Sequence, residues 1–270
     1  SLNDVDFNEP CDLVGLGTMG QSILRAMDIS VAFRKRGITT FMGGYMARLF
    51  PALVEKFTDS IIIGDAERSY PELLKDFEKR GRLKPIYRRP LHSLKGFKSA
   101  QYELFSGQRS FFIPVLTGRG CIHRCNFCSI ACLYRGQHLS RPLHEIERDI
   151  IRIRELGHRY LFFTDDNLMS DPAAFEALCR LLVPLRMKWA GQCTLLLARH
   201  PRLLKLAAQS GCFILNVGLE SIHAESLSFM NKAWLKPADV AWMLQRIHRE
   251  GIITNLQVII GTDHDDEASV

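Results

Sequence analysis

Three cysteines stand close together in the sequence, at Cys121, Cys125 and Cys128. Their spacing is C-x3-C-x2-C, and Gly118 and Gly120 precede them. Closely spaced thiolates are the ligands of iron–sulfur clusters. Three thiolates leave one iron of a four-iron cubane without a protein ligand, much as a catalytic zinc ion keeps an open position for its substrate. The sequence therefore predicts a 4Fe–4S cluster with one iron open to chemistry.

Other interpretations of this loop stay open. Cys132 follows Cys128 by four positions, so one alternative is a ferredoxin-like electron carrier with four cysteine ligands. His123 allows a structural Cys3His zinc site, although zinc sites usually draw ligand pairs from two separated segments and the chain has no second pair. Disulfides are a third alternative. They require an oxidising compartment, which nothing in the N-terminal sequence indicates.

Composition limits the class of protein. The 270 residues allow two domains, and 47% hydrophobic with 24% charged residues is ordinary for a soluble protein. No apolar run is long enough to span a bilayer, so we expect no transmembrane segment and a cytoplasmic location. The net charge of +6 is spread along the chain without a basic stripe, so no nucleic-acid partner is expected.

The first 81 residues alternate short apolar runs with helical patterns. This alternation predicts a parallel sheet with helices on its faces. Gly43, Gly44 and Gly64 follow expected strands, at the strand ends where such sheets bind ligands. The expected strands cover residues 12–17, 39–42 and 60–64, and the expected helices cover 21–36, 51–57 and 70–79.

Residues 82–110 lack a sustained pattern and are expected to connect two domains. From residue 111 to 270 the alternation resumes, which predicts a β/α barrel whose active site lies in the loops after the strands. The expected strands are 111–116, 159–164, 189–194, 213–219 and 256–260, and the expected helices are 143–156, 172–183, 201–209 and 238–250.

Polar clusters follow four of these strands. The cysteine loop follows the first, Asp165 and Asp166 the second, Glu220 and Ser221 the fourth, and Gly261 the fifth. Each cluster alone is compatible with a helix cap, because Asp, Asn and Ser favour that position. Their shared position at one mouth of a barrel favours a site.

The cysteine spacing, with Phe127 directly before Cys128, resembles the radical S-adenosylmethionine (SAM) superfamily. Most of the chain is similar to the group with an N-terminal cobalamin-binding-type domain. This resemblance implies a Rossmann-like N-terminal domain followed by a TIM-like partial barrel of six strands. The chain ends after the fifth expected strand, so we expect a fragment in which both domains are incomplete.

The resemblance also implies roles for the polar clusters. SAM binds the open iron, and its cleavage yields a 5′-deoxyadenosyl radical. Asp165 and Asp166 stand where the superfamily binds the SAM amino group, although its usual Gly-Gly-Glu is replaced here. Glu220 and Ser221 resemble the segment that contacts the ribose. Residues 259–261, which end at Gly261, and the backbone of Phe127 contact adenine; the alternative for Phe127 is a core aromatic.

Cobalamin is the further cofactor that the resemblance implies, bound at Gly43, Gly44 and Gly64. The chain has no Asp-x-His-x-x-Gly motif and its first histidine is His92, so no protein histidine on cobalt is expected. Members of the group methylate or rearrange unactivated carbon in hopanoid, lipid and pigment pathways. The implied partners are a small-molecule or lipid-like substrate and a reductant of the flavodoxin or ferredoxin type. The alternative within the superfamily is an enzyme without cobalamin.

Overall fold

A computed structural model describes residues 5–90, 92–105 and 111–265. The chain forms two compact units, Ser1–His92 and Ser93–Val270. Residues 106–110 of the expected connector and residues 266–270 of the expected barrel lie outside the described residues. Both units contain a parallel sheet covered by helices, so the predicted α/β class is confirmed. No helix in the described part of the chain is long and apolar enough to cross a membrane.

The first unit is built on a parallel sheet in the order β1-β2-β3-β4. Its strands are β1 Leu13–Thr18, β2 Thr39–Gly44, β3 Ser60–Ile62 and β4 Ile86–Tyr87. Its helices are α1 Ile23–Arg34, α2 Tyr45–Leu49, α3 Pro51–Val54 and α4 Ala66–Arg80. The sequence predicted the first three strands and missed β4, which lies inside the expected connector and is only two residues long.

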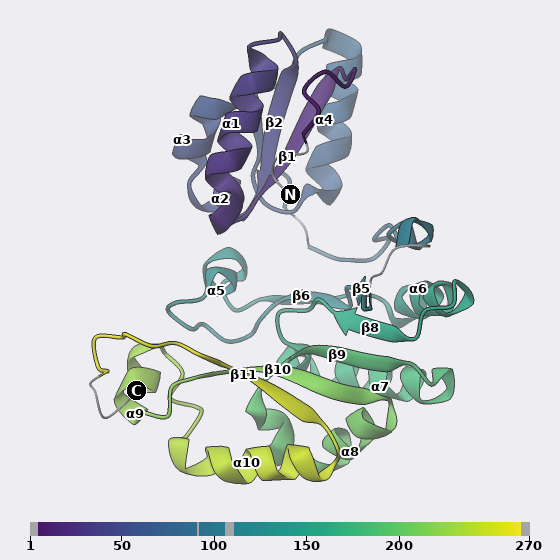
Figure 1. Cartoon of the computed structure of the whole chain (residues 1–270), viewed down its shortest axis with the longest axis vertical. Coiled ribbons are helices and arrows are strands. Elements are labelled where there is room, and N and C mark those ends of the chain that lie inside the picture. The colour runs from purple at the N-terminus through teal and green to yellow at the C-terminus, as the bar shows by residue number, and fades with distance from the viewer. Residues whose placement is uncertain (1–4, 91, 106–110, 266–270) are drawn as a thin grey trace. The chain divides into compact units, whose positions relative to one another are not determined.

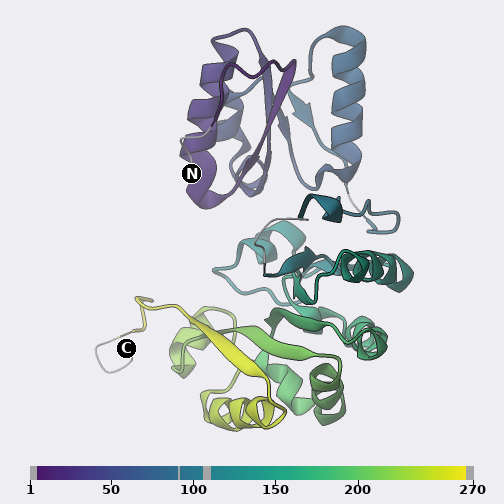
Figure 2. The same ribbon diagram turned by 45° about the vertical axis from the view of Figure 1, so that its right-hand side comes forward.

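Alternating side chains of this sheet build a core on each face. Ile61 and Ile63 pack with α1, whereas Ile62 packs with Leu73 of α4 and with Tyr87. Successive residues of a strand point to opposite faces, so a continuous apolar run suits a sheet covered on both sides. Figures 1 and 2 show α1 and α4 on opposite sides of the strands.

The second unit contains five parallel strands that neighbour one another in chain order. They are β5 Ile113–Val115, β8 Tyr160–Phe163, β9 Lys188–Cys193, β10 Cys212–Glu220 and β11 Ile253–Val258. The helices that connect them are α6 Leu143–Glu155, α7 Pro172–Leu185, α8 Pro201–Gln209 and α10 Pro237–Arg249, with α7, α8 and α10 on one face of the sheet (Figures 1 and 2). One core cluster, which includes Trp189 and Phe163, joins sheet and helices. The last strand ends earlier than predicted, so Ile259 and Ile260 follow it.

A short hairpin frames the cysteine loop and was not predicted. β6 Gly118–Gly120 pairs antiparallel with β7 His138–Ser140, and the short helices α5 Ser129–Tyr134 and α9 Ala224–Phe229 lie after the loop and after β10. A Cβ on Gly120, whose φ is +86°, would lie 2.2 Å from the Gln137 carbonyl oxygen. Only glycine fits this close approach of two backbones. Strands of three residues carry no periodicity, which is why the sequence did not reveal them.

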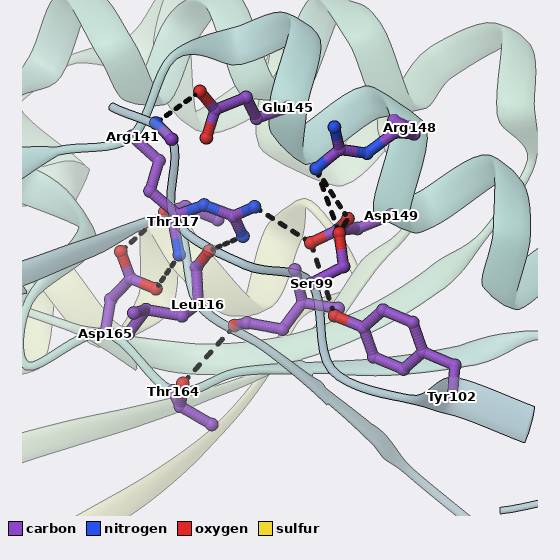
Figure 3. A network of polar contacts seen from close by, with 12 residues as sticks. Ser99, Tyr102, Leu116, Thr117, Arg141, Glu145, Arg148, Asp149, Thr164 and Asp165 are labelled. Atoms are coloured by element: carbon purple, nitrogen blue, oxygen red, sulfur yellow. Dashed lines mark hydrogen bonds and ion pairs between the residues drawn. The ribbon is translucent and has the colours of Figure 1, made fainter. Parts of the chain in front are cut away.

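The stretch expected as a connector contributes its first part to one unit and a later part to the other. Its first part supplies β4, and a later part bonds to α6, where Gly96 N donates to Glu145 Oε1 at 2.8 Å and Ser99 Oγ to Asp149 Oδ1 at 2.5 Å. Figure 3 shows that Arg141 lies in the same network. The division into units falls at residues 92 and 93, within this stretch.

Candidate functional site

The three predicted cluster ligands lie on the loop between β6 and α5. Cys121 and Cys128 are partly exposed, and Cys125 is buried at 9% exposure. The backbone turns between them, because Cys128 N donates to the Cys125 carbonyl oxygen at 3.1 Å. Cys132 lies on α5, and its thiol is exposed. All four thiols therefore lie on one short stretch of chain.

Burial has the largest effect on the Cys125 thiol, and it favours the protonated form. Burial raises the pKa of the Cys125 thiol, while the Lys232 ammonium lowers it and thiolates at Cys128 and Cys121 raise it, so these groups are near one another. No three His, Cys, Asp or Glu side chains of the described residues gather closely enough to hold one metal ion. Each cysteine of a cubane cluster binds a different iron, so its ligands stand farther apart than those of one ion. The donor set of the loop fits such a cluster.

Three consecutive side chains after β8 hold the start of the loop. Asp165 accepts hydrogen bonds from Thr117 N at 2.9 Å and Thr117 Oγ1 at 2.5 Å. Asp166 Oδ2 accepts one from Gly120 N at 2.7 Å. Asn167 Nδ2 lies 3.7 Å from the Cys121 sulfur, in donor geometry. The polar cluster predicted at this strand end therefore touches the cysteine loop directly.

The two aspartates differ in their access to a ligand. Asp165 is buried at 2% exposure, and burial raises its pKa to about 7 although the hydrogen bonds from Thr117 lower it. Asp166 is partly exposed. Both carboxylates bond to the start of the cysteine loop, Asp165 to Thr117 and Asp166 to Gly120. The two predicted SAM contacts therefore differ in exposure, and contact of either carboxylate with SAM stays a prediction.

Glu220 ends β10 in a conformation that is rare for its type. Its φ is 66°, in the left-handed region, and the pairing of β10 with β11 shifts register between Gly218 and Glu220. Lys232 Nζ lies 3.0 Å from Glu220 Oε1, with both side chains buried, and donates to the Gly218 carbonyl oxygen at 2.7 Å. A Cβ on Gly218 would lie 2.1 Å from Glu220 Oε1. Strained residues held in this way cluster at functional sites.

The other predicted SAM residues lie near turns. Ser221 Oγ accepts a hydrogen bond from His223 N at 3.0 Å, which forms a local turn before α9 and does not cap this helix. Gly261, with φ at +90°, donates its N–H to Asp265 Oδ2 at 2.9 Å. Phe127 is 46% exposed, so it is not a core aromatic. The alternative of a core role for Phe127 is therefore wrong.

The three glycines predicted to bind cobalamin have different surroundings. Gly44, with φ at +92°, has no room for a Cβ, which would lie 2.5 Å from the Thr18 carbonyl oxygen. Gly43 would place a Cβ at an ordinary 3.6 Å from Ile62. Gly64, with φ at +98°, has nothing within 4 Å of the Cβ position. Only Gly64 of the three therefore borders open space into which a flat cofactor or its nucleotide tail could approach the backbone.

Two side chains that contact this site were not predicted from the sequence. Asn167, which directly follows Asp165 and Asp166, was given no role of its own, and Lys232 was not singled out. Lys232 lies in a short connection after α9, where a lysine is usually solvated. A lysine in such a connection carries no local signal of burial, so only the tertiary contact with Glu220 identifies it.

Several known proteins are similar to this chain in sequence. The family model described as the radical SAM superfamily matches residues 115–269. Bacteriochlorophyllide d C-12(1)-methyltransferase of Chlorobaculum tepidum is 25% identical over 268 residues, which cover 96% of this chain and 58% of that protein. Hopanoid C-2 methylase of Rhodopseudomonas palustris is 27% identical over 177 residues, 63% of this chain and 33% of that protein. The chain thus spans about half the length or less of these curated relatives.

Two solved structures share the fold at low identity. The radical SAM methyltransferase TsrM from Kitasatospora setae, with cobalamin and a 4Fe–4S cluster bound, aligns with a TM-score of 0.78 at 19% identity, covering 99% of this chain and 62% of that one. The cobalamin-dependent SAM radical enzyme OxsB, with aqua-cobalamin and SAM bound, aligns at 0.74 with 14% identity, covering 94% and 41%. At these low identities, the similarity shows a shared fold and nothing further.

Proposed function

This chain belongs to the radical SAM superfamily, and from that premise we propose that Cys121, Cys125 and Cys128 hold a 4Fe–4S cluster whose open iron binds SAM. When bound, the cluster and SAM supply a 5′-deoxyadenosyl radical. One observation carries the proposal: the cysteine loop and the polar ends of β8, β10 and β11 all follow the carboxyl ends of strands in one parallel sheet. Ligands of α/β sheets bind at this edge. We regard the five strands as part of a β/α barrel.

The chain's own residues divide the work of binding SAM. Asp166 accepts hydrogen bonds from the ammonium, which are charge-assisted and stronger than neutral ones. Glu220 and Ser221 contact the ribose hydroxyls, and backbone at Phe127 and Gly261 lies against adenine. Asp165 supports the cysteine loop through Thr117, and we propose this role in place of its expected contact with SAM.

A cobalamin-dependent methylation of unactivated carbon is the reaction that we propose. Its support is the fold shared with TsrM and OxsB, together with relatives named as methyltransferases. Cobalamin would bind at the strand ends of the first unit, with Gly64 beside its open space and no histidine on cobalt. The substrates in the relatives' names favour a hydrophobic small molecule of the pigment or hopanoid type. A flavodoxin- or ferredoxin-type protein would supply electrons.

The first experiment tests the cluster and separates it from the electron-carrier alternative. The chain is reconstituted anaerobically with iron and sulfide, alongside Cys121→Ala, Cys125→Ala, Cys128→Ala and Cys132→Ala. We expect the first three variants to lose iron and visible absorption and Cys132→Ala to keep both. Loss of the cluster in Cys132→Ala would instead support four protein ligands.

The second experiment tests the chemistry. SAM, a reductant and hydroxocobalamin are added to the reconstituted chain and the products are identified. 5′-Deoxyadenosine establishes radical chemistry and S-adenosylhomocysteine indicates methyl transfer. Radical product without any retained cobalamin would favour the radical SAM enzyme that lacks this cofactor.

Electron paramagnetic resonance of bound cob(II)alamin tests the ligation of cobalt. The spectrum should show no axial nitrogen splitting, and clear splitting would reject the proposed ligation.

A further inference from the structure

The middle of the cysteine loop is bonded to a distant stretch, residues 229–234, which we call the clamp segment. Asn126 N donates to the Met230 carbonyl oxygen at 3.0 Å. The Asn126 side chain donates through Nδ2 to the Phe229 carbonyl oxygen at 2.7 Å, across 103 positions of sequence. Backbone and side chain of one asparagine are therefore both used to join the loop to the end of α9.

A second asparagine makes the reciprocal contact. Asn231 Nδ2 donates to the Arg124 carbonyl oxygen at 2.8 Å. Next to this bond the ring of His123 stacks on Trp234, with ring centroids 4.2 Å apart and planes at 17°. The contacts at Arg124 and at Asn126 lie directly before and after Cys125. The clamp segment therefore fixes the backbone on both sides of this cysteine.

The clamp segment is itself firmly anchored. Leu227 and Met230 are buried, and Lys232 N closes the end of α9 by donating to the Leu227 carbonyl oxygen at 2.7 Å. The Lys232 ammonium is paired with Glu220. Asn231 has a φ of 55°, a left-handed conformation that asparagine tolerates better than most residues. This turn aims the Asn231 amide at the loop.

We propose that the clamp segment holds Cys125 in place before a cluster is bound, with Asn126 and Asn231 as its positioning residues. The inference rests on the proposed function of the cysteine loop. An unattached loop would have to be ordered when the cluster binds, and ordering backbone costs conformational entropy. Bonds to an anchored segment transfer this cost to folding, so the thiols are preorganised and the bound cluster is retained longer.

The test measures iron release from the reconstituted, full chain into an excess of ferrous chelator under anaerobic conditions. Asn231→Gly removes the amide donor and keeps the left-handed turn, because glycine adopts positive φ freely. Asn126→Ala removes the bond to Phe229. Asn255→Ala is the matched control, since it deletes a similarly exposed amide bond of 3.0 Å to Asn216 away from the loop. We expect iron release about fivefold faster in each clamp variant, the equivalent of one hydrogen bond worth about 1 kcal/mol, and no change in the control.

A second readout uses the chain without a cluster. Alkylation of Cys125, followed by mass spectrometry, should be faster in Asn231→Gly and Asn126→Ala than in the wild type, whereas the exposed Cys132 should react equally in all. If the wild type retains iron and the clamp variants match Asn255→Ala in both readouts, the proposed role of the clamp segment is wrong while the proposed function stands. A wild-type chain that retains no iron would overturn the proposed function and the clamp with it.

Discussion

Replacement of Asp149 by asparagine should destabilise the second unit strongly. Arg141 and Asp149 form an ion pair of 2.9 Å in which each side chain is only 1% exposed. Asp149 also accepts hydrogen bonds from Ser99 at 2.5 Å and from Tyr102 at 3.5 Å. Figure 3 shows these donors converging on the one carboxylate. Asparagine keeps the size of the side chain but leaves the Arg141 guanidinium buried without its counter-charge.

The magnitude follows from burial. Removal of one partner of a buried ion pair costs about 3–5 kcal/mol, because the remaining charge stays desolvated. The carbonyl of the substituted asparagine would still accept one hydrogen bond, and Arg141 keeps its bond to the Leu116 carbonyl oxygen at 2.8 Å, so we expect a loss of about 3 kcal/mol. Domains are stable by only about 5–15 kcal/mol, so this loss is large.

Urea unfolding followed by tryptophan fluorescence measures this effect. All three tryptophans, Trp189, Trp234 and Trp242, lie in the second unit, so the signal reports that unit. Arg148→Gln is the control, because the Arg148 guanidinium is 3.7 Å from the same carboxylate but its side chain is 60% exposed. Exposed ion pairs contribute about 0–1 kcal/mol. A loss in Asp149→Asn no greater than in this control would refute the argument from burial.

Further changes test the other polar and glycine positions. In the unfolded chain Asp165 ionises near its ordinary pKa of 3.8, whereas burial in the folded chain raises this pKa to about 7. The contribution of Asp165 to the free energy of unfolding should therefore fall as the pH rises from about 4 to 7. Urea titrations at several pH values measure the free energy of unfolding of the wild type minus that of Asp165→Asn. This difference should drop by up to about 4 kcal/mol between pH 4 and 7. A difference that does not change with pH would contradict the raised pKa. Gly218→Ala should displace Glu220 from Lys232 and lower the free energy of unfolding of the second unit, by about 3 kcal/mol if the pair is broken. An unchanged free energy from urea unfolding would contradict this expectation. Gly44→Ala should destabilise the first unit, seen by circular dichroism, by more than about 1 kcal/mol because φ is positive and Thr18 is in the way, while Gly43→Ala should cost less; equal losses would contradict the geometry.

The sequence by itself determined the class of fold and the place of the candidate site. Apolar runs and helical periodicity are local properties, so most strands of both sheets were found within a few residues. The spacing of Cys121, Cys125 and Cys128 is equally local, and it placed the candidate cluster on one loop. The order of the strands predicted that the polar clusters lie together, because the carboxyl ends of parallel strands meet at one edge of a sheet.

Only the tertiary structure decided what each polar side chain does. Asp165 and Asp166 are adjacent in sequence and chemically identical, yet the first is buried on Thr117 and the second is partly exposed. Burial depends on neighbours far away in the chain, and no local pattern encodes it. The same holds for the bond from Asn231 to Arg124, across 107 positions. Hydrogen bonds of this kind are set by how loops meet after folding, which is why the residues that hold the cysteine loop had no signal in the sequence.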